Sequence, residues 1–342
     1  MNEVNRQMIT LARESRGFNQ KEFAELIKMS NSNIGKIENG DIGVNLENLK
    51  NIAVETDYPL HFFIQKGVMV SDSLSWRKRK KVAQKLMVPI FAKAKIIAMH
   101  VRILHQSLQV KAPKIPYIPV KDDCAPSLIA KKVGQIWEIN DIKNTSLLKK
   151  IEDQGIIVMS FDFKTSRIDS FTLLTEDNFP VIFLNSLISG DKQRFSLAYE
   201  IGQLVMFTYN KVDISYDISN DCNAFAAEFL MPEKEIREDF EKGVSFAGLA
   251  LLKKKWKVSM IALLYRADDL GYLTSNQKRY LMQQFNEANI RRHEPEDLKI
   301  SKEEPRLMKY LIGELRKKTD LSVTDTAELL CLQIGEFIEI YS

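Results

Sequence analysis

The first 66 residues place the tightest constraint on the fold, because their apolar residues recur at helical spacing in short runs that turn-forming residues separate. Glycine, asparagine and serine interrupt the pattern at residues 16–19, 29–30 and 39–43, where they supply turns and helix caps. The apolar positions are Met8, Ile9, Leu11, Ala12, Phe23, Ala24, Leu26, Ile27, Ile34, Ile37, Leu46, Leu49, Ile52 and Ala53. The pattern predicts a compact all-α unit of several short helices.

Within this unit, residues 19–40 have the sequence of two helices joined by a tight turn. Ala24 is small enough to let the helices cross closely, and Leu26, Ile34 and Ile37 fill the wedge between them. This is the helix-turn-helix arrangement, in which the front of the second helix enters the major groove of DNA. Gln20 opens the first helix, where a helix N-terminus can meet a phosphate. The residues expected to reach base edges or phosphates from the second helix are Asn31, Ser32, Asn33 and Lys36.

From about Arg6 to Phe63 the pattern resembles the Xre/Cro/phage-repressor family of DNA-binding domains, including the Ile-Glu-Asn-Gly sequence at residues 37–40. The resemblance implies binding to a double-stranded DNA operator, and the alternative is a helical docking domain that has lost DNA contact. One departure is Lys28, which stands at a tight corner where that family often has glycine. Residues 1–66 hold eight Lys and Arg against nine Asp and Glu, so we expect affinity to depend on a homodimer and on neighbouring basic residues.

The following segment is strongly polarised in charge. From Ser73 to Lys121 there is no Asp or Glu, while twelve Lys and Arg lie there. Arg77, Lys78 and Arg79 open this segment and are predicted to contact DNA phosphates; the alternative is a solvated linker and helix face. Pro89 is expected to begin or kink a helix that runs to about residue 110.

The middle of the chain mixes strands with helices. β-branched and apolar runs at residues 155–161, 168–175 and 180–184 predict a small sheet. Helical periodicity covers residues 124–133, 147–153, 194–209, 220–231, 246–254, 259–270 and 275–287. The middle of the chain is therefore predicted to be an α+β domain.

The stretch Arg194-Phe-Ser-Leu-Ala-Tyr-Glu-Ile-Gly-Gln-Leu-Val205 is the most informative part of that domain. It resembles the signature RFTLAHELGHLLLH of the ImmA/IrrE family of zinc metallopeptidases, with Tyr199 and Gln203 at the places of the two histidines. Residues 223–232 match that family's ANxFAAELLMP block, and the resemblance spans most of residues 77–298. Together with the start of the chain, it implies a fusion of the two families.

In an HExxH motif, two histidines one helical turn apart bind zinc and the glutamate polarises the metal-bound water. Tyr199 and Gln203 are poor zinc ligands, so Glu200 has no activated water to act on. The resemblance places an acidic third ligand near Asp221, but one carboxylate does not hold zinc alone. We therefore expect no metal, no cofactor and no catalytic residue. Glu200 is expected to be held by hydrogen bonds from Tyr199 or Gln203, or to satisfy helix packing.

None of the four histidines is expected to replace the missing ligands. His61 lies in the helix-turn-helix domain at residues 1–66, which we call the reader. His100 and His105 lie on the helix expected after Pro89, and His293 falls in a loop near the C-terminal end of the peptidase-like domain. Such dispersed histidines are ordinarily not metal ligands.

Three functions remain open at this point. The leading hypothesis is a transcriptional regulator whose peptidase-like cleft binds a peptide, small-molecule or protein effector. A second is an antitoxin that binds a toxin and represses its own operon, and the third and weakest is an active zinc metallopeptidase.

The predicted architecture is multidomain. It comprises an all-α helix-turn-helix domain (1–66), a basic linker and helix (67–121), an α+β metallopeptidase-like domain (122–298) and a helical C-terminal extension (299–342). The three isolated cysteines and the lack of a long apolar run predict a cytoplasmic protein with no membrane partner. Apolar residues at helical spacing from Leu307 onwards are expected to be buried within the same chain; the alternative is an interface between chains.

Overall fold

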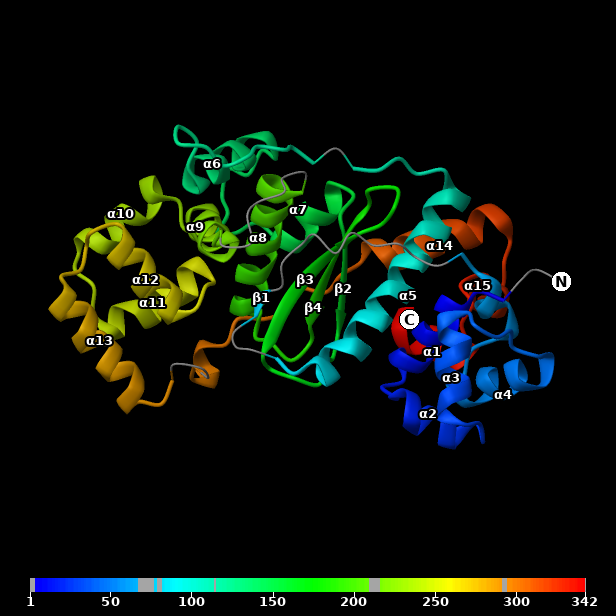
Figure 1. The fold of residues 1–342 in the computed structure, drawn as a ribbon. Helices are drawn as coiled ribbons and strands as arrows, with labels where there is room; N and C mark the ends of the chain where they lie inside the picture. The colour runs from blue at the N-terminus through cyan, green and yellow to red at the C-terminus, as the bar shows by residue number, and fades with distance from the viewer. Residues whose placement is uncertain are drawn as a thin grey trace.

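The computed structural model describes residues 4–66, 82–113, 115–208, 216–290 and 294–341, together with the backbone of residues 77–78. Figure 1 shows a central sheet, a helical lobe on the left that contains α10 to α13, and the N-terminal helices on the right beside the C-terminal ones. The multidomain architecture predicted from the sequence is thus observed.

The N-terminal unit consists of α1 (Arg6–Ser15), α2 (Gln20–Leu26), α3 (Asn31–Asn39), α4 (Leu46–Thr56) and the 3-10 helix η1 (Leu60–Ile64). Each of the four α-helices is preceded by a capping residue whose side chain accepts a backbone N–H of the first turn, namely Asn5, Asn19, Ser30 and Asn45. Lys28 has φ of 57°, which confirms the left-handed corner expected between α2 and α3.

The helix expected within the basic segment is α5 (Gln84–Leu108), and it begins before Pro89 rather than at it. Most of its apolar side chains are buried against α1, the sheet and the C-terminal helices. Its role is therefore largely that of a core helix that connects the N-terminal unit to the sheet. Side chains such as those of Lys85 and Lys93 are exposed, and their contact with DNA stays a prediction.

The sheet contains β1 (Arg77–Lys78), β2 (Ile157–Phe161), β3 (Ile168–Leu174) and β4 (Pro180–Asn185) in the order β1-β3-β4-β2. Strand β4 runs parallel to β2 and antiparallel to β3. Because side chains alternate along a strand, Phe171 and Leu173 of β3 join the core shared with α5, while Leu174 and other alternate residues join the core around α8. The sheet therefore separates two hydrophobic cores.

Three further helices lie before the left-hand lobe in the chain. These are α6 (Pro126–Ile136), α7 (Leu147–Asp153) and α8 (Gly190–Phe207), the last of which packs on β3 and β4. The chain continues through α9 (Ile218–Leu230), α10 (Glu233–Glu241), α11 (Phe246–Trp256), α12 (Met260–Asp269) and α13 (Ser275–Glu287). The periodicity did not predict α10, whose sequence contains only a few apolar residues between charged ones.

The C-terminal part contains η2 (Glu296–Leu298), α14 (Leu307–Thr319), α15 (Val323–Leu329) and α16 (Ile334–Tyr341). Helix α14 packs on α5 and β2, and its residues Met308, Leu311, Ile312 and Leu315 are buried, as expected for burial within one chain. Leu329 and Ile334 remain 37% and 40% exposed, so that expectation does not hold for the whole tail. Among the described residues, no helix is long and apolar enough to cross a membrane.

Candidate DNA-reading surface and peptidase-like centre

The front of α3 presents the side chains that the sequence assigned to DNA. Asn31, Ser32, Asn33 and Lys36 are exposed, whereas Ile34 and Ile37 are buried against the rest of the unit. The structure therefore brings the four polar residues to one accessible face of a helix. Their contact with DNA stays a prediction.

Gln20 is exposed at the start of α2, but its carboxamide is already engaged. Its Nε2 donates to Glu38 Oε2 of α3 at 2.7 Å. An amide nitrogen carries two N–H groups, so one remains for a phosphate. The hydrogen bond ties Gln20 to α3, a contact that the sequence did not suggest.

A buried ion pair ties α3 to α1. Arg13 of α1 binds Glu38 through two hydrogen bonds, Nε to Oε1 at 2.6 Å and Nη2 to Oε2 at 3.0 Å, and both side chains are almost fully buried. Arg13 Nη1 also donates to the carbonyl of Phe18 at 2.8 Å, at the turn before α2. A bidentate pair of this kind fixes orientation as well as distance, so α3 and the start of α2 are both tied to α1. Sequence reasoning missed this pair because Arg13 and Glu38 are far apart in the chain.

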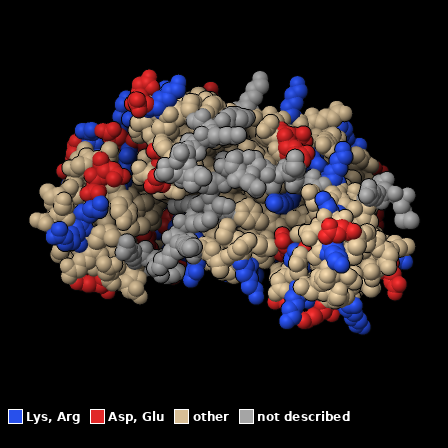
Figure 2. All heavy atoms as spheres, viewed as in Figure 1, with Lys and Arg blue, Asp and Glu red and all other residues tan. Residues whose placement is uncertain are grey.

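Charges of both signs cover the N-terminal unit, as Figure 2 shows at the lower right. The structure places the backbone of Arg77 and Lys78 in β1, where Arg77 pairs with Ser170 at the sheet edge, and Arg79 lies outside the described residues. Arg77 and Lys78 therefore belong to the sheet and not to a short linker beside the helix-turn-helix domain. Their predicted phosphate contacts stay a prediction.

The peptidase-like centre lies on α8, where Tyr199, Glu200 and Gln203 are all buried. Glu200 is 0% exposed and accepts hydrogen bonds from two hydroxyls of β3. Ser170 Oγ donates to Oε1 at 2.6 Å, and Thr172 Oγ1 donates to Oε2 at 2.7 Å. Both carboxylate oxygens are thus engaged by the sheet, partners that the sequence analysis did not foresee.

Helix α9 crosses α8 closely at Gly202. A Cβ at this position would lie 2.8 Å from the Phe225 ring of α9, which is closer than real carbon contacts. Tyr199 Oη donates to Ser219 Oγ of α9 at 3.2 Å. Beyond it, the Tyr216 hydroxyl donates to Asp221 Oδ2 at 2.6 Å, and this bond raises the pKa of Tyr216 to about 12. Both carboxylates that the resemblance relates to zinc chemistry therefore accept hydrogen bonds from hydroxyl groups. Glu200 accepts them from Ser170 and Thr172, and Asp221 accepts one from Tyr216.

A second buried ion pair lies behind α9. The Arg266 guanidinium of α12 binds the Glu228 carboxylate, and its Nε donates to the Met231 carbonyl at 3.1 Å. Both side chains are almost fully buried, and Lys131 of α6 lies 3.5 Å from the same carboxylate. The acidic residue in the 223–232 block is therefore a packing element that joins three helices.

The histidines occupy separate parts of the fold. His61 hydrogen-bonds the Glu328 carbonyl at 2.7 Å, His100 bonds the Tyr341 hydroxyl at 2.6 Å, and His105 packs against Phe179. His293 lies outside the described residues. Within the described parts of the chain, no three His, Cys, Asp or Glu side chains lie close enough together to hold a metal ion.

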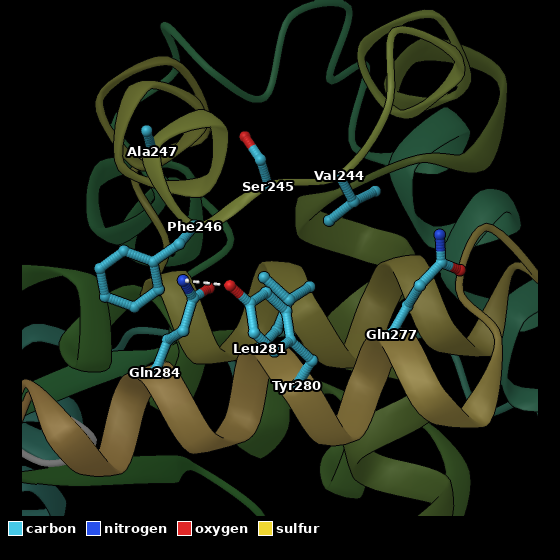
Figure 3. A pocket seen from close by; sticks show the side chains of 8 residues that line it. All are labelled: Val244, Ser245, Phe246, Ala247, Gln277, Tyr280, Leu281 and Gln284. Carbon is cyan, nitrogen blue, oxygen red and sulfur yellow. Dashed lines mark hydrogen bonds between the residues drawn. The ribbon is translucent and has the colours of Figure 1, made fainter.

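A surface hollow of about 480 Å³ lies between the start of α11 and α13. Figure 3 shows Phe246, Tyr280 and Leu281 around it, with Gln284 Nε2 hydrogen-bonded to the Tyr280 hydroxyl at 3.5 Å. Its lining comprises apolar side chains, two carboxamides and hydroxyls. None of the residues predicted for the peptidase-like centre lines this hollow.

Comparison with known proteins agrees with this geometry. The model of the helix-turn-helix family matches residues 9–63, and that of the IrrE N-terminal-like domain matches residues 151–268. The radiation response metalloprotease IrrE of Deinococcus radiodurans is 35% identical over 97 residues, which cover 25% of this chain and 30% of that protein. The chain thus matches less than a third of that relative's length. It carries a helix-turn-helix domain followed by an IrrE-like domain.

Proposed function

We propose that the protein is a sequence-specific DNA-binding transcriptional regulator, in which the IrrE-like domain senses an effector and has lost zinc catalysis. The observation that carries the first part is the exposed face of α3, with Asn31, Ser32, Asn33 and Lys36 accessible and the helix held by the Arg13–Glu38 pair. A rigid recognition helix with polar residues at its front is what major-groove reading requires.

Replacing Asn33 or Lys36 with alanine is expected to weaken binding to the operator. A side chain that reads a base edge contributes about 1–3 kcal/mol of discrimination, whereas one on a phosphate weakens all sequences alike. The operator is first selected from random DNA with the full chain, and affinities are then measured at fixed salt. We further propose that the protein binds as a homodimer, so the footprint is expected to show two half-sites about one helical turn apart.

Two substitutions on α4 serve as controls for this experiment. Asn51→Ala and Lys50→Ala remove the same side-chain types from exposed positions outside the reading face. Wild-type affinity in the α3 variants, or equal losses in the α4 variants, contradicts the assignment of α3 as the recognition helix.

The second part of the proposal concerns the peptidase-like centre. Tyr199 and Gln203 stand at the positions that the resemblance gives to zinc ligands, and Glu200 is engaged by Ser170 and Thr172. A carboxylate bound in this way is oriented towards the sheet, which supports a structural role rather than one as a general base. Since these side chains are buried, an effector such as a peptide, a small molecule or a protein segment reaches them only when covering residues move.

The purified full-length protein is expected to contain far less than one zinc ion per chain and to cleave no peptide. Tyrosine stays protonated near neutral pH, and an amide is a weak ligand compared with the imidazole that zinc sites use. Elemental analysis of the wild type beside the double variant Tyr199→His, Gln203→His checks this, with the double variant as the reference for a restored motif. Zinc near one equivalent in the wild type, lost on Glu200→Gln or Asp221→Asn, overturns the proposal.

A further inference from the structure

The segment after the IrrE-like domain passes along α7 and α8 and then reaches the helix-turn-helix domain. In Figure 1 it continues from the left-hand lobe past the sheet to α14 on the right. We call residues 294–306 the strap. Its backbone lies so close to the start of α8 that a Cβ on Gly190 would stand 2.4 Å from the carbonyl oxygens of Ile300 and Ser301. Only glycine fits there without a shift of the strap.

Glu303 anchors the strap to both helices. Its backbone N–H and C=O pair with the Gln193 carboxamide of α8 at 2.8 Å each. Its carboxylate lies 3.3 Å from the Arg194 guanidinium and accepts the Leu148 N–H of α7 at 3.0 Å. The Ser146 hydroxyl, at the start of α7, also donates to this carboxylate. One strap residue therefore contacts the helix that carries Tyr199, Glu200 and Gln203.

The far end of α7 holds the start of α14. The Glu152 carboxylate accepts the backbone N–H groups of Arg306 and Leu307, each at 2.8 Å. Two peptide N–H groups at the first residues of α14 are thereby satisfied, as a helix N-terminus requires. The end of α7 is thus hydrogen-bonded directly to the start of α14.

The helices after the strap contact the helix-turn-helix domain at the end of α1 and at η1. Glu336 of α16 forms two hydrogen bonds with the Arg16 guanidinium, at 2.8 and 2.7 Å. That guanidinium also lies 4.3 Å from the Tyr58 ring centre and donates to the Thr56 carbonyl at 2.7 Å. Together with the His61 bond to the Glu328 carbonyl, these contacts fix the end of α1, the end of α4 and η1 to the C-terminal helices.

We propose that the strap and helices α14–α16 form a coupling element that links the conformation of α8 to that of the helix-turn-helix domain. Both ends consist of specific hydrogen bonds in partly or fully buried positions, and the helices between them share one core with α1 and α5. The coupling goes beyond DNA binding, and it exists whether or not the protein recognises an operator. Coupling between two sites is reciprocal, so a perturbation at either end reaches the other.

Hydrogen exchange measured by mass spectrometry on the full-length protein tests this coupling from both ends. Glu303→Gln and Gly190→Ala disturb the strap at α8, and Glu304→Gln changes the same charge at an exposed neighbour. Glu303→Gln and Gly190→Ala are each expected to speed hydrogen exchange at residues 56–66 by a factor of about 5 to 150, the range typical of coupled sites. The Glu304→Gln control is expected to leave those residues unchanged.

Glu336→Gln disturbs the other end, with Glu339→Gln as the exposed control on the same helix. We expect faster exchange at residues 146–153 with Glu336→Gln alone. Helix α13 serves as the internal reference, since faster exchange there reveals general unfolding. Faster exchange confined to the residues around each substitution overturns the coupling, as does an equally large increase in α13. The DNA affinity of these variants does not test the coupling.

Discussion

Replacing Arg266 with leucine is expected to lower the free energy of unfolding by about 3–5 kcal/mol, the usual cost of removing one partner of a buried ion pair. The substitution leaves the Glu228 carboxylate buried, where Lys131 at 3.5 Å and the backbone N–H of Glu233 at 3.3 Å are the remaining partners among the described residues. It also leaves the Met231 carbonyl without the Arg266 N–H that binds it at 3.1 Å. Urea unfolding of the full chain, followed by circular dichroism, gives the change in free energy.

The double variant Glu228→Met, Arg266→Leu removes both charges and is expected to recover much of this loss, because an apolar pair needs no compensation. Arg237→Leu is a suitable control, since Arg237 lies on the surface of α10 and pairs with half-buried Glu233. A surface pair of this kind contributes little, so the unfolding midpoint of this variant should scarcely move. An Arg266→Leu protein as stable as the parent shows that the pair does not hold α9 and α12 together.

Acidification from pH 7 to pH 5 is expected to remove about 4 kcal/mol of stability through His100 and His105. Burial lowers the pKa of His100 to about 3 and that of His105 to about 4, from an ordinary value of 6.5. The unfolded chain therefore binds these protons below pH 6.5 while the folded protein does not. Each histidine thus costs about 1.4 kcal/mol per pH unit below pH 6.5, until its own folded pKa is reached.

His105→Phe isolates one of these contributions. Phenylalanine keeps a ring against Phe179, whose centre lies 3.6 Å from that of His105, but it does not titrate. The variant is expected to lose stability less steeply between pH 6 and pH 5, by about 1.4 kcal/mol per unit. Burial raises the pKa values of carboxyl groups such as those of Glu14 and Glu152, so these groups stabilise the folded protein as the pH falls. Both proteins contain these groups, so their effect cancels in the difference in stability between variant and parent. Equal pH slopes in the two proteins contradict the assignment.

Much of the secondary structure followed from local sequence. Helices α7 and α13 and strand β3 lie within a residue of their predicted bounds, because their periodicity and flanking turn residues act over short distances. The positive φ of Lys28 was also predictable, since the corner between α2 and α3 is part of the sequence pattern. The exposed polar face of α3 followed for the same reason.

Contacts between distant segments could not be predicted in this way. The hydroxyls that hold Glu200 come from β3, the carboxylate that holds Arg13 comes from α3, and the carboxylate that holds Arg16 comes from α16. The charge pattern of residues 73–121 likewise did not predict that α5 is a core helix. The lysines in that segment drew the interpretation to solvent and DNA, whereas most apolar side chains of α5 are buried. Nothing in the local sequence distinguishes these partners from other polar residues.

The sequence by itself determined the helix-turn-helix domain and the IrrE-like domain, because the pattern of each depends on residue types at fixed short spacings. Only the tertiary structure decided that Glu200 faces the sheet, that α5 lies in the core and that the strap joins α8 to the reader. The physical reason is that burial and hydrogen bonding depend on which segments meet in space. Segments as distant as Arg16 and Glu336 meet only in the folded chain.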